Sequence, residues 1–212
     1  YAHIPLIHGT DGAKLSKRHG ATSLFDYHDL GYTSDAMFSY LLQLGWSAKN
    51  DEDYCIHRAT RLFALENVSK SPAKFDIKKL NNINAKNINS MKINDIYTLV
   101  IDKFKLSLND EEQKRFKSLL PELLKRVQVY TDLEFEFDWL FQKDFFCKDK
   151  NYQLKLQKNN LILKEIGFKL KECEWSVENI KSTLNQYILD KSLTFKDIGP
   201  ILRMALTGKT NS

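Results

Sequence analysis

The sequence predicts an all-α fold, apart from a short irregular piece at its start. Apolar residues recur at helical spacing over most of the 212 residues, capping patterns precede several of these runs, and Gly and Pro number only eight and four. Hydrophobic residues make up 42% and aromatic residues 12%, which is enough to bury a core and excludes a disordered chain. The length allows one large domain or two small ones.

The first twenty residues are rich in turns and leave no room for a helix longer than one turn. The residues responsible are Pro5, Gly9, Gly12 and Gly20. The first long helix is expected from an N-cap at Ser34 to Gly45, because six apolar residues form a broad face between them. A short helix is expected over 57–65.

Three capping patterns mark later helices. Asp76 is expected to cap a helix whose apolar residues are spaced three to five apart. Asn109 with Glu112, and Thr131 with Glu134, have the spacing of capping boxes.

The remaining helices are predicted from periodicity alone. They cover 94–104, 154–170, 176–190 and 196–206. Pro121 and Pro200 lie inside helical patterns and are expected to kink or divide them. The alternation over 133–137 is also compatible with a strand, but no second strand accompanies it. The three Trp residues are expected in the core, with base stacking as the alternative for any that is exposed.

Charge is concentrated in one half of the chain. Residues 132–138 hold four acidic residues and no basic one, whereas 142–171 hold eight lysines against three acidic residues. A basic segment without a hydrophobic run suits a polyanion such as nucleic acid. A solvated, lysine-rich helix face is the alternative.

The composition also excludes several classes of protein. No apolar run approaches the ~20 residues of a bilayer span, so a membrane protein is excluded and no membrane partner is expected. Three distant cysteines, Cys55, Cys147 and Cys173, lack a second ligand at metal spacing. They predict no metal site and fit a reducing, cytoplasmic compartment.

The strongest local signal is the Gly-bracketed segment 9–20, GTDGAKLSKRHG. Lys14, Lys17 and Arg18 place three cations within five residues, with the Ser16 hydroxyl between them. Such a loop can surround a triphosphate, because its charges and hydrogen-bond donors meet phosphate oxygens. A basic surface turn is the alternative.

The spacing of KLSKR (14–18) is similar to the K-M-S-K-S signature of class I aminoacyl-tRNA synthetases. Three longer stretches resemble the glutamyl-tRNA synthetase family in its own order. They are HIPLIHGTDGAKLSKRHGATSLFDYHDLGYTSDAMFSYLLQLGWS (3–47), FALENVSKSPAKFDIKKL (63–80) and PILRMALTGKTNS (200–212). The resemblance therefore covers nearly the whole chain. It departs from the family at 81–89, NNINAKNIN, where a Trp and a Gly-Lys-Tyr are usual.

The resemblance implies three regions in an elongated, multi-helix arrangement. Residues 1–20 would be the end of the catalytic region with its KLSKR loop, 21–92 a helical stem-contact domain, and 93–212 a helical anticodon-binding domain whose two parts meet near 142. Nothing matches the family's Rossmann-type half with its H-I-G-H-like motif. The chain is thus expected to be a fragment trimmed at both ends and inactive alone.

The resemblance also implies site residues. Lys17 matches the lysine that neutralises the ATP phosphates and is the expected catalytic residue, with Lys14, Ser16 and Arg18 as further ATP-binding residues. Arg126, at a predicted helix end, and Arg203, within LRMALTG, are the candidate tRNA contacts, since the planar guanidinium can read a base edge or stack on it. An arginine that pairs with a helix end or a carboxylate is the alternative.

The expected function is therefore that of the tRNA-binding part of a cytoplasmic, monomeric glutamate–tRNA ligase. Such an enzyme activates glutamate with ATP and Mg²⁺ and transfers it to tRNA(Glu), with tRNA(Gln) as a second candidate substrate; this fragment is expected to bind no cofactor tightly. The alternative is a non-catalytic helical RNA-binding module that keeps KLSKR as a relic. The shorter paralogue that glutamylates a modified tRNA base is disfavoured, because it lacks the helical anticodon region.

Overall fold

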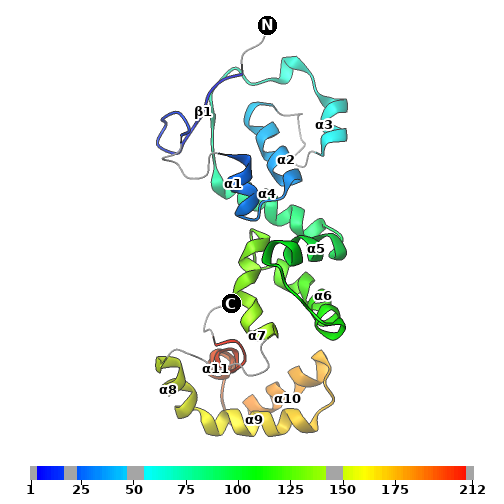
Figure 1. The fold of residues 1–212 in the computed structure, drawn as a ribbon. Helices are drawn as coiled ribbons and strands as arrows, with labels where there is room; N and C mark the ends of the chain where they lie inside the picture. Colours follow the sequence, from blue (N-terminus) through cyan, green and yellow to red (C-terminus); the bar gives the residue numbers. More distant parts are fainter. Residues whose placement is uncertain (1–3, 17–22, 47–54, 142–149, 209–212) are drawn as a thin grey trace. The chain divides into compact units, whose positions relative to one another are not determined.

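The computed structural model describes residues 4–16, 23–46, 55–141 and 150–208. These residues are mostly helical, which confirms the all-α prediction (Figure 1). The one sheet in the described ranges is a pair of two-residue strands. The chain divides into two compact units, unit 1 (1–134) and unit 2 (135–212). Unit 1 runs across residue 92, and the domain boundaries implied by the resemblance stay a prediction.

Unit 1 contains the sheet, six α-helices and a short 3₁₀ helix among its described residues. They are β1 (Ile7–His8), α1 (Leu24–Asp29), α2 (Ser34–Gly45), α3 (Ile56–Leu62), η2 (Leu65–Asn67), β2 (Ala73–Lys74), α4 (Ile77–Ser90), α5 (Ile93–Phe104) and α6 (Asp110–Leu124). A longer 3₁₀ helix, η3 (Tyr130–Glu136), follows them.

The core of unit 1 lies between α2 and α4, which pack side by side (Figure 1). Its buried residues are Tyr32, Ala36, Met37, Tyr40, Leu80 and Ile83. The hydroxyl oxygen of Tyr40 accepts a hydrogen bond of 2.6 Å from the backbone N–H of Asp76, the N-cap of α4. Burial raises the pKa of Tyr40 to about 12, so the phenol stays neutral in this position.

Helices α5 and α6 extend unit 1 and pack on each other, while α6 also packs on α4. Their apolar faces are buried, which is the arrangement that their periodicity predicts. The fully or nearly buried residues are Ile96, Val100, Phe116, Leu120, Leu123 and Leu124.

Unit 2 is helical throughout its described residues. It contains α7 (Phe137–Phe141), α8 (Lys150–Lys158), α9 (Asn160–Glu172), α10 (Val177–Asp190) and α11 (Phe195–Thr207). Ile166, Tyr187 and Ile198 form its core, one residue from each of the last three helices. Helix α9 packs against α10, and α11 packs against both α7 and α8.

The predicted caps were partly right. Asp76 caps α4, and Asn109 with Glu112 forms the expected capping box on α6. Helix α2 begins at Ser34, but its N-cap is Thr33, whose hydroxyl accepts from Ala36 N–H. The capping box at Thr131 was wrong, because Thr131 donates its hydroxyl to the carbonyl of Leu30 instead.

Three further expectations have mixed outcomes. Residues 133–137 belong to η3 and the start of α7, which agrees with the helical reading and not with the strand alternative. Pro121 and Pro200 do not divide their helices, since α6 and α11 continue through them, and the expected kink stays a prediction. The segment predicted as one helix over 154–170 is divided between α8 and α9.

The tryptophans differ in burial. Trp46 is buried as expected, whereas Trp175 is 75% exposed and lies outside the core. The described helices include none whose length and apolar content would let it cross a bilayer.

Candidate functional site

A tight hairpin presents the first two residues of KLSKR. The backbone N–H of Gly9 donates to Ala13 O at 2.8 Å, and Leu15 N–H donates to Ile7 O at 2.9 Å. Gly12 closes the turn at φ +80°, a conformation that a side chain disfavours, and the Asp11 carboxylate accepts from Ala13 N–H. The Gly-rich sequence therefore folds as a hairpin whose return arm carries Lys14.

Lys14 lies in a row of basic residues across three backbone segments. His8 forms an antiparallel bridge with Lys14 on one side and pairs in parallel register with Lys74 of β2 on the other. Directly paired residues project their side chains from the same face of a sheet. Both lysines are exposed. Sequence reasoning missed His8 and Lys74, because nothing in the sequence pairs strands that are 66 residues apart.

The row suits phosphate rather than a metal ion. Lys14 and Lys74 flank His8 in this row, and their two ammonium groups favour an anion beside them. Ammonium and hydroxyl donors fit phosphate oxygens, whereas a metal ion needs acceptor ligands. No group of three His, Cys, Asp or Glu side chains that could hold a metal occurs in the described ranges. Ser16 is exposed next to the row, and Lys17 and Arg18 lie outside the described residues.

The two candidate tRNA-binding arginines are exposed and belong to different units. Arg126 follows the C-cap of α6, as predicted, and its charge helps Lys125 to lower the pKa of Glu122. Arg203 lies on α11 beside the buried Met204. The carbonyl of Arg203 accepts the hydroxyl of Thr207, one turn before the left-handed Gly208 that ends the helix. Local helix structure thus fixes the backbone of both arginines.

A buried asparagine joins the two halves of unit 1. Asn84 on α4 is fully buried, and its Nδ2 donates to the carbonyls of Gly31 at 3.3 Å and Gln128 at 2.7 Å. Its Oδ1 accepts from the backbone N–H and the hydroxyl of Thr33 at 2.9 and 3.2 Å. Asn84 therefore holds the α1–α2 loop and the segment after α6 on the same helix.

Neighbouring side chains reinforce this junction. Tyr32 OH donates to Asn81 Oδ1, and Asn81 Nδ2 donates to Gln128 Oε1 at 2.7 Å. Asn89 Nδ2 donates to Leu124 O at 3.2 Å. The asparagine-rich stretch 81–89, where the sequence departs from the family pattern, is thus a structural junction. This junction could not be predicted from the sequence, because a polar residue on a helix is usually exposed.

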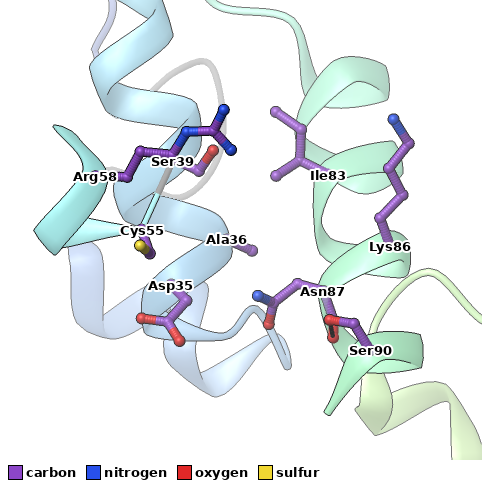
Figure 2. Close-up of a pocket in the computed structure, with 9 residues that line it drawn as sticks. All are labelled: Asp35, Ala36, Ser39, Cys55, Arg58, Ile83, Lys86, Asn87 and Ser90. Carbon is purple, nitrogen blue, oxygen red and sulfur yellow. Dashed lines mark hydrogen bonds between the residues drawn. The ribbon is translucent and has the colours of Figure 1, made fainter. Parts of the chain in front are cut away.

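A polar groove of about 300 Å³ opens on the other side of α4 (Figure 2). Asp35, Ser39 and Arg58 line it from α2 and α3, and Lys86 and Asn87 line it from α4. Figure 2 shows the guanidinium of Arg58 reaching toward α4. The groove carries both signs of charge, and sequence reasoning did not foresee it.

Comparisons with known proteins agree with the two parts of this site. A family described as the catalytic domain of class I tRNA synthetases (E and Q) matches residues 1–82, and a family described as an anticodon binding domain matches residues 94–212. The hairpin lies within the first match, and both candidate arginines lie within the second.

Curated relatives share these regions. Glutamate–tRNA ligase 1 of Bartonella henselae is 36% identical over all of this chain and 46% of its own length. Glutamate–tRNA ligase 1 of Hyphomonas neptunium is 37% identical over 98% of this chain and 44% of its own length. The chain therefore spans about half the length of the curated relatives that it matches.

Solved structures share the fold. A glutamate tRNA ligase from Elizabethkingia meningosepticum, crystallised in complex with its amino acid, matches with a TM-score of 0.78 at 23% identity, over all of this chain and 46% of that one. Glutamate-tRNA synthetase from Elizabethkingia anophelis matches with a TM-score of 0.73 over the same shares, also at 23% identity. The chain belongs to the glutamate–tRNA ligase family of class I tRNA synthetases, with part of the catalytic domain followed by the anticodon-binding domain.

Proposed function

We propose that this chain supplies the ATP-phosphate loop and the tRNA-binding region of a glutamate–tRNA ligase. One observation carries the proposal. The hairpin that contains the start of KLSKR precedes, in the same chain, a helical region that matches anticodon-binding domains, in the order of its relatives. In the intact enzyme, MgATP activates glutamate as the adenylate, and the terminal ribose of tRNA(Glu) then accepts the glutamyl group. We propose a monomeric, cytoplasmic enzyme, with tRNA(Gln) as a second candidate substrate.

The hairpin would act in the first step. Negative charge develops on the pyrophosphate as it leaves ATP, and Lys17, with Lys14, Ser16 and Arg18, would neutralise it. The Gly12 turn supports this role, because it holds Lys14 and Ser16 at the exposed end of a short, hydrogen-bonded hairpin. Lys74 adds positive potential on the other side of His8 from Lys14.

The substitution Lys17→Ala tests the catalytic role. In an enzyme with a complete catalytic domain, it is expected to lower glutamate-dependent ATP–pyrophosphate exchange by orders of magnitude. The substitution removes a positive charge that would neutralise the leaving pyrophosphate. The affinity for tRNA should hardly change, and a filter-binding assay measures it. Lys70→Ala, in a loop of the same unit, is the matched charge control. Unaltered exchange in the Lys17 variant would defeat the role of Lys17.

The second role is recognition of the anticodon arm. Arg126 and Arg203 are exposed at backbone positions fixed by helix ends, and we propose that they contact unpaired bases. A titration of the 212-residue chain with tRNA(Glu) and with an anticodon-changed copy, at two salt concentrations, tests this function. Tighter binding to the cognate tRNA at both concentrations is expected. Equal binding that collapses with salt would contradict anticodon reading and leave only a basic surface.

The same titration separates the roles of the arginines. Arg203→Ala should weaken binding of the cognate tRNA by about 1–3 kcal/mol and reduce the preference for its anticodon. An equal loss on both tRNAs would instead make Arg203 a phosphate or structural residue.

A further inference from the structure

A groove of about 390 Å³ lies between α9 and α10 of unit 2. Its lining residues are Lys164, Glu165, Phe168, Lys169, Tyr187 and Lys191. On α9, Lys164 and Phe168 are one turn apart, as are Glu165 and Lys169, so all four share one face of the helix. The groove is therefore a feature of a helix pair that packs together, not of a loop.

Phe168 is the exposed one of the two aromatic residues that line this groove. Its side chain is 64% exposed, and it makes no ring contact with another described aromatic or cationic side chain. The ring faces of an exposed phenylalanine contribute little to the stability of the fold. Those faces are free to stack on a planar ligand.

Of the three lysines around Phe168, one has no ion pair with a described residue. Glu165 accepts from Lys191 Nζ and from Tyr187 OH, each at 2.8 Å, and these bonds lower the pKa of the Glu165 carboxyl. Lys169 lies 3.7 Å from the Asp190 carboxylate. Lys164, one turn from Phe168, has no ion pair with any described residue.

This combination selects the chemistry of the ligand. Three lysines face two carboxylates, Glu165 and Asp190, so the unpaired charge of Lys164 is left to attract an anion. The open aromatic ring beside it favours a planar base. A nucleotide offers both, with a phosphate for a lysine and a base for a ring. A protein segment would need charge and shape complementarity over a larger area than this groove provides.

We propose that the groove between α9 and α10 holds one unpaired nucleotide of the tRNA, with its base stacked on Phe168 and its phosphate near Lys164. The inference rests on the proposed function, because it takes tRNA as the partner of the region that matches anticodon-binding domains. It adds a contact on a helix pair that carries neither Arg126 nor Arg203.

Fluorescence anisotropy with a labelled anticodon stem-loop RNA tests this site on the 212-residue chain. Phe168→Ala is expected to weaken binding about tenfold without changing how affinity depends on salt, since stacking releases no counterion. Lys164→Ala is expected to weaken binding and to lower the slope of log affinity against log salt by about one. Thermal unfolding should be unchanged in both variants, because both side chains are exposed.

Two matched controls lie outside the groove. Leu161→Ala removes a side chain that is 71% exposed on the same helix, and Lys181→Ala removes an exposed lysine from α10. Neither should change affinity by more than about twofold. The nucleotide site is wrong if Phe168→Ala binds the RNA as tightly as Leu161→Ala, and Lys164→Ala as tightly as Lys181→Ala. If the unchanged chain then still prefers the cognate anticodon, the proposed function stands. If the unchanged chain binds no RNA, both fail.

Discussion

The junction in unit 1 and the helix packing in unit 2 hold their surroundings together in different ways. At the junction, single polar side chains bridge segments that are far apart in sequence. Asn84 donates hydrogen bonds to the carbonyls of Gly31 and Gln128, and Thr131 donates one to the carbonyl of Leu30, 101 residues away. In the described part of unit 2, the side-chain hydrogen bonds join nearer residues, such as Tyr187 and Glu165, 22 residues apart. Unit 1 is therefore vulnerable at single positions, whereas the groove face of unit 2 can vary and take up a binding role.

The largest expected effect is that of Gly31→Ala. Gly31 has φ +91°, and a Cβ there would lie 2.6 Å from Thr131 Oγ1 and 2.9 Å from Thr131 N. The backbone of the junction would have to move, so we expect a loss of at least about 3 kcal/mol in the free energy of unfolding. Urea denaturation of the 212-residue chain measures it.

Gly12→Ala is the control that isolates the close approach. Gly12 has φ +80° but no atom within 4 Å of the added Cβ. Only the backbone conformation is then unfavourable, and the expected loss is about 1 kcal/mol. Equal losses of stability at the two glycines would show that the close approach of Thr131 to residue 31 adds no cost of its own.

The next effect in size is that of Asn84→Ala. The substitution leaves the carbonyls of Gly31 and Gln128 and the N–H of Thr33 without this partner in a buried site, which is expected to cost about 3 kcal/mol. Asn82→Ala, on the exposed side of the same helix, should stay within about 0.5 kcal/mol of the unchanged chain. A loss at Asn82 as large as that at Asn84 would show that the buried hydrogen bonds of Asn84 are not what stabilises the junction.

A glycine in unit 2 should respond with the opposite sign. Gly167 lies inside α9, and nothing stands within 4 Å of an added Cβ. Gly167→Ala is expected to stabilise the chain by about 0.5–1 kcal/mol, because alanine loses less conformational freedom in a helix. A higher midpoint of thermal unfolding is the readout, and a lower one would contradict an open site at Gly167.

The smallest expected effect concerns pH. Hydrogen bonds from Lys191 and Tyr187 lower the pKa of Glu165 from its usual 4.5, so the folded state binds its proton less readily than the unfolded state does. The stability from these bonds is present above pH 4.5 and is lost as the pH falls through the lowered pKa. In urea titrations, Glu165→Gln should flatten the pH dependence below 4.5, and an unchanged dependence would show that the carboxylate is too well solvated to contribute.

What the sequence predicted well is local. The end of α2, the Asp76 cap and the box of Asn109 with Glu112 depend on residues within a few positions of each other, and the structure has all of them. The KLSKR segment and Arg203 were chosen from short motifs and Arg126 from its place at a helix end, and their roles stay predictions.

What the sequence could not predict depends on partners distant in the chain. Thr131 has the spacing of a helix cap, yet its hydroxyl bonds Leu30, because folding brings that carbonyl within 2.7 Å. In the sequence, Asn84 is one of several asparagines in the same predicted helix. Its burial depends on two other segments that fold around it. The pairing of His8 with Lys74 and the groove around Phe168 have the same origin.

The bond between Thr131 and Leu30 has a consequence for the order of folding during synthesis. Helices α2 and α4 emerge from the ribosome before the segment that completes their junction, and synthesis of residues 85 to 131 takes roughly 2–10 s at 5–20 residues per second. During that interval the polar atoms of Asn84 lack Gln128. Unit 1 is therefore exposed to misfolding until α6 has been made, whereas α9, α10 and α11 can pack as soon as the last of them appears.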